Sequence, residues 1–157
     1  MNHAAEWEAA RQQVSEWRAS GKTIVFTNGC FDLLHPGHID YLSKARALGD
    51  VLIVGLNDDQ SITGLKGPNR PINPLADRAL MLAALKAVDL VVPFAEETPL
   101  ELIKTLLPDI LIKGGDYKPD AIVGAKEVRD NGGHVSVITF VDGYSSTALI
   151  KRIQQIG

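Results

Sequence analysis

The sequence is poor in cysteine and has no long apolar run, and both features limit what the chain can be. Its single cysteine, Cys30, cannot form an internal disulfide or a cysteine-based zinc site. No apolar run approaches the ~18 residues that a membrane-spanning helix needs. Residues 1–18 are polar and charged, unlike the apolar segment of a signal peptide. We therefore expect a cytoplasmic protein without a membrane segment.

The chain also lacks an excess of positive charge. It carries 16 basic and 19 acidic side chains, a formal net charge of −3. This balance argues against a surface that neutralises nucleic-acid phosphates, so we expect no nucleic-acid partner. At ~150 residues per domain, 157 residues amount to one domain. A chain of this length buries enough surface to fold without a disulfide or a structural metal.

Short apolar, β-branched segments alternate with helical patterns along the chain. Strands are predicted at residues 23–27, 51–56, 90–92, 110–112 and 135–140, and helices at 4–19, 37–48, 76–87, 100–107, 120–131 and 147–155. Apolar strands that alternate with helices are typical of a parallel sheet covered on both faces. The sequence therefore predicts one doubly wound, Rossmann-like α/β domain with a five-stranded parallel sheet. Residues 57–74, rich in glycine and proline, are predicted to form a long irregular loop.

The most informative motif follows the first predicted strand. Residues 28–38 read Asn-Gly-Cys-Phe-Asp-Leu-Leu-His-Pro-Gly-His and lead into an amphipathic helix. Pro36 suits the first helical position, and Gly37 allows a ligand to approach closely. Histidines three residues apart lie on one side of a helix N-terminus, where they can donate hydrogen bonds to phosphate oxygens. A zinc site is less favoured, because no cysteine or glutamate completes it.

Three further segments follow predicted strands, where parallel sheets bind ligands. Lys66 and Arg70 are positioned to reach a polyphosphate, although solvated loop charges are the commoner role. Residues 113–116, Lys-Gly-Gly-Asp, combine a cation with a glycine turn that exposes backbone N–H groups, but an ordinary turn with an extended lysine explains them equally well. Residues 143–147 place three hydroxyls before the last helix, more than an N-cap needs.

Other residues have structural or open roles. Cys30 is expected to be a packing residue rather than a nucleophile. Asp32 either caps the turn or orients a histidine. Arg78 is expected to form a structural ion pair at a helix start, with Asp77 as its neighbour. The two tryptophans, Trp7 and Trp17, are expected in the core or in a dimer contact.

Residues 29–38 resemble the G-x-F-D-x-x-H-x-G-H signature of the nucleotidyltransferases related to glycerol-3-phosphate cytidylyltransferase. Segments 66–74, 84–89, 108–117 and 142–147, together with Arg78, are similar to the heptose adenylyltransferases, which form ADP-heptose for the lipopolysaccharide inner core. The resemblance begins near Lys22 and divides the chain into an N-terminal helical extension, residues 1–21, and a nucleotidyltransferase domain, residues 22–157. Many members are fused behind a sugar kinase. The length leads us to expect the free-standing form, with a separate heptose kinase acting upstream.

The resemblance implies that AMP is transferred from ATP to D-glycero-β-D-manno-heptose 1-phosphate, and it implies three groups of site residues. These are catalytic His35, His38 and Lys66; nucleotide-binding Asn28, Gly29, Cys30, Phe31, Gly37, Gly143, Ser145, Ser146 and Thr147; and sugar-phosphate-binding Arg70, Lys113, Gly114 and Asp116. Mg²⁺ is expected on the ATP phosphates rather than on protein ligands. We also expect a homodimer.

The nucleotide preference is inferred from the last motif. In the cytidylyltransferases of this family the last motif resembles R-T-E-G-I-S-T-T. This chain has Phe140 in place of the arginine. Without that guanidinium the cytidylyltransferase contacts cannot form, which favours ATP. The alternatives are a cytidylyltransferase for an alditol phosphate such as glycerol 3-phosphate, an adenylyltransferase for pantetheine phosphate, and a catalytically silent nucleotide-binding module.

Overall fold

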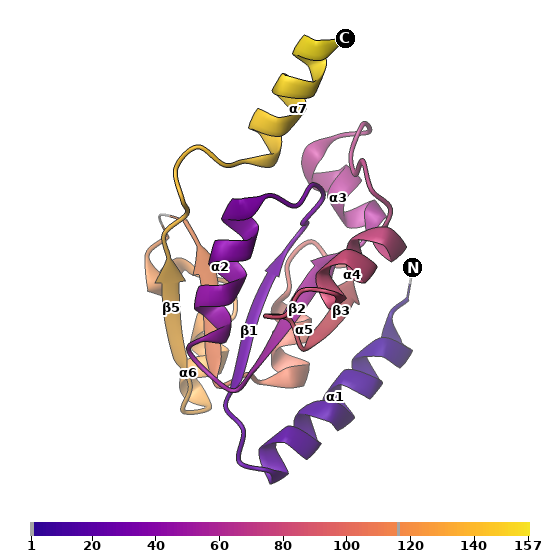
Figure 1. Cartoon of the computed structure of the whole chain (residues 1–157). Coiled ribbons are helices and arrows are strands. Elements are labelled where there is room, and N and C mark those ends of the chain that lie inside the picture. Colours follow the sequence, from indigo (N-terminus) through magenta and orange to yellow (C-terminus); the bar gives the residue numbers. More distant parts are fainter. Residues whose placement is uncertain (1, 116) are drawn as a thin grey trace.

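The computed structural model describes residues 2–115 and 117–157, so Asp116 lies outside the described residues. Five strands form one parallel sheet in the order β3-β2-β1-β4-β5. They are β1 (Ile24–Gly29), β2 (Val51–Asn57), β3 (Leu90–Phe94), β4 (Ile110–Gly114) and β5 (His134–Ile138). The strand order reverses beside β1, and doubly wound sheets bind ligands beyond the strand ends at that point (Figure 1). The predicted doubly wound fold is confirmed.

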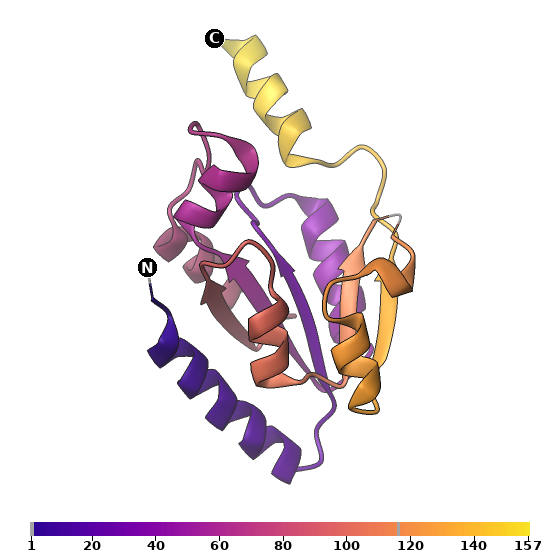
Figure 2. The same ribbon diagram turned by 180° about the vertical axis from the view of Figure 1, so that it is seen from behind.

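Helices cover both faces of the sheet. On one face lie α2 (Pro36–Arg46) and α4 (Leu75–Ala83), and on the other lie α1 (Ala4–Ala19), α5 (Leu100–Leu106) and α6 (Ala125–Asp130) (Figures 1 and 2). Neighbouring strand residues alternate between the two cores: Val25 packs with α2 and α4, whereas Ile24 and Phe26 pack with α1, α5 and α6. Because both faces of the sheet are covered, most strand positions are apolar.

The N-terminal helix α1 shares the core of the sheet. Ala10 and Val14 are buried, and Trp7 and Trp17 pack against the same cluster. Trp7 also donates a hydrogen bond from Nε1 to the carbonyl oxygen of Pro93 at 2.8 Å. Of the two roles expected for the tryptophans, core packing is observed. The division of the chain into an N-terminal extension, residues 1–21, and a domain, residues 22–157, stays a prediction.

The prediction of an irregular loop at residues 57–74 is wrong in its first half, which contains α3 (Asp59–Lys66). The side chain of Asp58 caps this helix by accepting a hydrogen bond from the Ser61 N–H at 2.9 Å. Gly67 ends it with a φ of 99°. The helix predicted at 120–131 is interrupted by Gly124, whose φ of 88° separates the short 3₁₀ turn η1 (Pro119–Ala121) from α6.

The C-terminal helix α7 (Ser146–Ile156) projects from the body of the molecule beyond the carboxyl edge of the sheet (Figures 1 and 2). None of its described residues is buried. Among residues 2–115 and 117–157, no helix combines the length and apolar character needed to cross a bilayer.

Candidate active site

Four segments meet at the carboxyl edge of the sheet: the β1–α2 turn, the end of α3, the end of β4 and the segment before α7. They line two adjoining cavities of about 180 and 320 Å³, which we call the histidine cleft. Four residues line both cavities: His38, Lys66, Phe140 and Ser146. The structure therefore brings together predicted residues from distant parts of the chain.

His35 and His38 stack against each other at the start of α2. Their ring centroids lie 3.8 Å apart with an interplanar angle of 24°. The Nδ1 atom of His38 accepts a hydrogen bond from the backbone N–H of His35 at 3.3 Å. In the neutral ring the proton therefore lies on Nε2, which remains available as a donor.

Both histidines are held in the neutral form. Burial, reinforced by the charges of His35 and Lys66, lowers the pKa of His38 to about 4. Burial also lowers the pKa of His35. Near pH 7 the two rings therefore act as neutral hydrogen-bond donors toward an anion.

We expect the His38 ring to stay neutral down to about pH 4 in the ligand-free protein. An unfolded histidine binds its proton near ~pH 6.5, so the unfolded state takes up this proton first as the pH falls. The stability that depends on neutral His38 is therefore lost between about pH 6.5 and pH 4. An NMR titration of the ring should show a midpoint near 4. Thermal melts of His38→Gln should show a smaller loss of stability between about pH 6.5 and pH 4 than melts of the wild type. An NMR titration midpoint near ~6.5 for His38 would contradict the expectation.

Lys66 and Cys30 lie on the wall of the cleft. Lys66 is the last residue of α3 and faces His38 closely enough for its charge to act on that ring. Burial raises the pKa of the Cys30 thiol and outweighs the opposing charges of Lys66, Arg78 and Arg70. The thiol is therefore protonated at neutral pH, which agrees with packing rather than nucleophilic catalysis.

Asp32 anchors the loop that follows α3. Its carboxylate accepts hydrogen bonds from the N–H groups of Ile72 (2.7 Å) and Asn73 (2.8 Å) and from Arg70 Nε (2.8 Å). Although burial raises the pKa of Asp32, these donors hold it below its ordinary value. The sequence left two roles open for Asp32, capping the turn and orienting a histidine, and the structure shows neither of them. Arg70, predicted to bind the sugar phosphate, is paired with Asp32 and does not line the histidine cleft.

Arg78 lies fully buried beneath the cleft. It pairs with Asp59 at 2.7 Å rather than with the neighbouring Asp77, so the expected ion pair has a different partner. Its guanidinium also donates to three backbone carbonyls, those of Cys30, Asn57 and Asn73. Its role is structural, as the sequence indicates.

Two glycines allow aromatic rings to lie directly on the main chain of the site. A Cβ at Gly114 would come within 2.5 Å of the Phe140 ring, and one at Gly37 would come within 2.9 Å of the His35 ring. Phe31, between β1 and α2, has a φ of 45° although it is not glycine. Such a conformation costs ~1–3 kcal/mol and is typical of functional turns. These positions shape the cleft.

The hydroxyl segment at the start of α7 divides its roles among three residues, Ser145, Ser146 and Thr147. Ser145 is the N-cap and accepts a hydrogen bond from the Ala148 N–H at 3.0 Å. Ser146 donates from Oγ to the carbonyl oxygen of Leu33 at 3.2 Å, which ties the segment to the β1–α2 turn. The Thr147 hydroxyl lines the cleft and has no hydrogen-bond partner within the described part of the chain. Gly143 precedes this segment with a φ of 89°.

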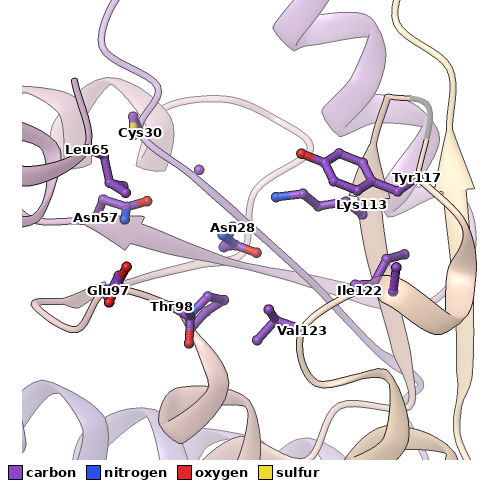
Figure 3. A pocket seen from close by; sticks show the side chains of 13 residues that line it. Asn28, Cys30, Asn57, Leu65, Glu97, Thr98, Lys113, Tyr117, Ile122 and Val123 are labelled. Carbon is purple, nitrogen blue, oxygen red and sulfur yellow. The ribbon is translucent and has the colours of Figure 1, made fainter.

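A second hollow, which we call the side pocket, adjoins the cleft and has a volume of about 330 Å³ (Figure 3). Asn28, Gly29, Cys30 and Lys113 line both the side pocket and the cleft. The Nζ atom of Lys113 lies 5.2 Å from the centroid of the Tyr117 ring, within cation–π range. The two hollows are therefore neighbouring parts of one site.

Sequence reasoning missed most of the side pocket. Asn57 is the last residue of β2, Glu97 and Thr98 follow β3, and Tyr117 follows β4. The signal that could have found them is their position at strand ends, because motifs were predicted after the first, second, fourth and fifth strands but none after the third. Across the described ranges, no three His, Cys, Asp or Glu side chains lie together as a metal site.

Comparison with known proteins gives consistent relatives. The cytidylyltransferase-like family model matches residues 26–152. The bifunctional protein HldE of Gluconacetobacter diazotrophicus is 55% identical over 148 residues, 94% of this chain and 31% of that protein. HldE of Histophilus somni is 58% identical over 139 residues, 88% of this chain and 29% of that protein. The chain spans about a third of the length of these curated relatives.

A solved structure shares the fold at recognisable sequence similarity. The crystal structure of the lipopolysaccharide core biosynthesis protein from Thermoplasma volcanium GSS1 is 30% identical, with a TM-score of 0.62. The match covers 80% of this chain and 100% of that one.

Proposed function

Because the chain belongs to the cytidylyltransferase-like family of nucleotidyltransferases, we propose that it transfers AMP from ATP to D-glycero-β-D-manno-heptose 1-phosphate. The products would be ADP-heptose and pyrophosphate. The observation that carries the proposal is the convergence of His35, His38, Lys66 and the hydroxyl segment on one cleft that adjoins a second pocket. The heptose is supported by the resemblance of the later motifs to heptose adenylyltransferases.

The two hollows fit the two substrates. The triphosphate of ATP would lie in the histidine cleft, and the sugar phosphate in the side pocket beyond Lys113. A phosphate oxygen of the sugar attacks the α-phosphorus, and the bond from that phosphorus to the bridging oxygen breaks. The electron pair of the broken bond leaves with pyrophosphate. A phosphate monoester has its second pKa near ~6, so the nucleophile is already ionised and no general base is required.

The chain's own residues lower the barrier by stabilising negative charge. His38 donates from Nε2, and Lys66 and the N-terminus of α2 add positive potential at the transferred group. Thr147 and the backbone N–H groups at the start of α7 hold the outer phosphates on the side from which pyrophosphate leaves. Lys113 offsets the charge of the incoming sugar phosphate.

A magnesium ion would fit this site only as part of the bound nucleotide. Asp32 lines the cleft, but its two carboxylate oxygens already accept three hydrogen bonds. Phosphate oxygens and water are ligands that Mg²⁺ accepts readily. When bound there, the ion would neutralise charge on the phosphates. The sugar 1-phosphate would come from a separate phosphorylation step.

A pyrophosphate-release assay with two substrate pairs tests the proposal. We expect ATP with heptose 1-phosphate to be used at least ~10²-fold more efficiently in kcat/KM than CTP with glycerol 3-phosphate, which corresponds to roughly 2.7 kcal/mol. The reason is that Phe140 places an apolar ring at the cleft in the position where the cytidylyltransferases have an arginine. Equal efficiency with the CTP pair, or no pyrophosphate from the ATP pair, would refute the assignment.

A further inference from the structure

We propose that Glu97 is a specificity-determining residue that accepts hydrogen bonds from sugar hydroxyls in the side pocket, supported by Asn57 and Thr98. The inference rests on the proposed function, because it takes a sugar 1-phosphate as the occupant. It assigns to these three residues the selection of the sugar, as distinct from the binding of its phosphate.

The lining of the side pocket matches a sugar ring in its two kinds of surface. Its apolar part includes Leu65, Pro99, Ile122 and Val123. Its volume of about 330 Å³ lies within the range for small-molecule sites. Figure 3 shows Asn57 and Glu97 on one side of the pocket, and Lys113, Ile122 and Val123 on the other. A sugar presents apolar C–H faces and polar hydroxyl edges, and it can satisfy both surfaces at once.

Asn57 is a fixed acceptor on this wall. It is 4% exposed, and its Nδ2 donates to Ser61 Oγ at 3.0 Å. Its backbone carbonyl is held by Arg78 at 2.7 Å. These bonds set the orientation of the amide, and its Oδ1 has no hydrogen-bond partner among residues 2–115 and 117–157. A hydroxyl donor from a ligand would complete it.

Thr98 contributes a donor next to Glu97. Its Oγ1 accepts a long hydrogen bond of 3.4 Å from the backbone N–H of Leu100. This contact leaves the hydroxyl proton free to point toward the pocket. The Thr98 hydroxyl is a donor, and Asn57 and Glu97 are acceptors. Recognition of a polyol requires both.

The charge of Glu97 is unfavourable unless it binds hydroxyls. The side pocket has to receive a phosphate dianion, and a carboxylate on its wall repels that charge. Glu97 is exposed and has no ion-pair partner in the described part of the chain, so it is not placed there by a structural salt bridge. A carboxylate that accepts from two hydroxyls forms charge-assisted bonds about twice as strong as neutral ones. Lys113, across the pocket, is then left to hold the phosphate.

The position of the side pocket favours the acceptor over the nucleotide. In-line displacement puts the attacking group and the leaving pyrophosphate on opposite sides of the α-phosphorus. His35, Ser145 and Thr147 line only the cavity of the cleft that shares no residue with the side pocket. The attacking sugar phosphate is therefore the group that approaches from the side of Asn57 and Glu97.

Steady-state kinetics of Glu97→Gln test the assignment, with Glu96→Gln as the matched control. Both variants remove one negative charge, but Glu96 does not line the side pocket, and its carboxylate accepts from the Ala95 N–H. We expect Glu97→Gln to raise the KM for heptose 1-phosphate at least tenfold and to leave the KM for ATP within twofold. Glu96→Gln should change neither. A sugar KM unchanged in Glu97→Gln, or a rise in the ATP KM instead, would overturn the inference.

A binding measurement separates this inference from the proposed function. Calorimetry on the protein saturated with an ATP analogue in which a methylene group replaces the α–β bridging oxygen compares a panel of heptose and hexose 1-phosphates with inorganic phosphate. The wild type should prefer one sugar phosphate over inorganic phosphate, and Glu97→Gln should lose at least tenfold of that preference. If this loss occurs while no sugar gives pyrophosphate, the proposed function fails and the sugar assignment stands. If turnover occurs but the preference is unchanged, the assignment of Glu97 fails.

Discussion

We expect His38→Ala to lower kcat by about 10²- to 10³-fold while the protein remains folded. The reason is the fixed proton on Nε2, set by the 3.3 Å hydrogen bond that Nδ1 accepts from the His35 backbone. A donor held in position before the reaction stabilises the developing charge without reorganising, and loss of one such donor commonly costs this much. Because the charge develops in the transition state, kcat should fall more than the KM for ATP rises.

His134→Ala is the matched control for this effect. That histidine is exposed at the start of β5, at the edge of the sheet opposite to the cleft. Its removal should leave kcat unchanged. His35→Ala should lower kcat to a similar degree as His38→Ala, because the two rings stack and line the same cavity. Near-wild-type turnover in both His35→Ala and His38→Ala, measured beside a thermal melt, would eliminate the histidine cleft as the reaction site.

The fold was predictable because its signal is local. The central strands are largely buried on both faces, so their sequences are mostly apolar, as in β2, where all seven residues are buried. The helix α3 was missed because it has eight residues, contains Gly64 and ends at Gly67. Its stability comes from the Asp58 cap and from packing of Ile62, which is fully buried. Such tertiary contributions do not appear in a short window of sequence.

The site was predictable where one segment carries both its backbone geometry and its chemistry. A strand, a glycine turn and a helix start in one segment predict the position of the histidine pair. The end of β4 in the same way predicts the position of Lys113. Asp32 and Arg70 were harder, since they are 38 residues apart and their pairing depends on the course of the intervening chain. Glu97 belongs to no motif. It acquires its position only when β3 is placed beside β2, at the far edge of the sheet from β5.

The largest stability effect is expected for Arg78→Met, which should lower the free energy of unfolding by about 3 to 5 kcal/mol. Methionine fills most of the space but donates no hydrogen bond. Arg78 is 0% exposed and donates to the carbonyls of Asn73 (2.8 Å), Cys30 (2.9 Å) and Asn57 (2.7 Å). Each buried carbonyl left without a donor costs about 1–3 kcal/mol.

Asp59→Asn distinguishes the carbonyl contacts from the ion pair. The carboxylate of Asp59 is 48% exposed, so its pair with Arg78 is solvent-screened and should contribute less than about 1 kcal/mol. Urea unfolding should therefore show a large drop in the midpoint for Arg78→Met and a small one for Asp59→Asn. Equal losses would mean that the ion pair, not the carbonyls, holds Arg78 in place. Because Cys30 and Asn57 line the pockets proposed to hold the two substrates, folded Arg78→Met should also show raised KM values for ATP and heptose 1-phosphate.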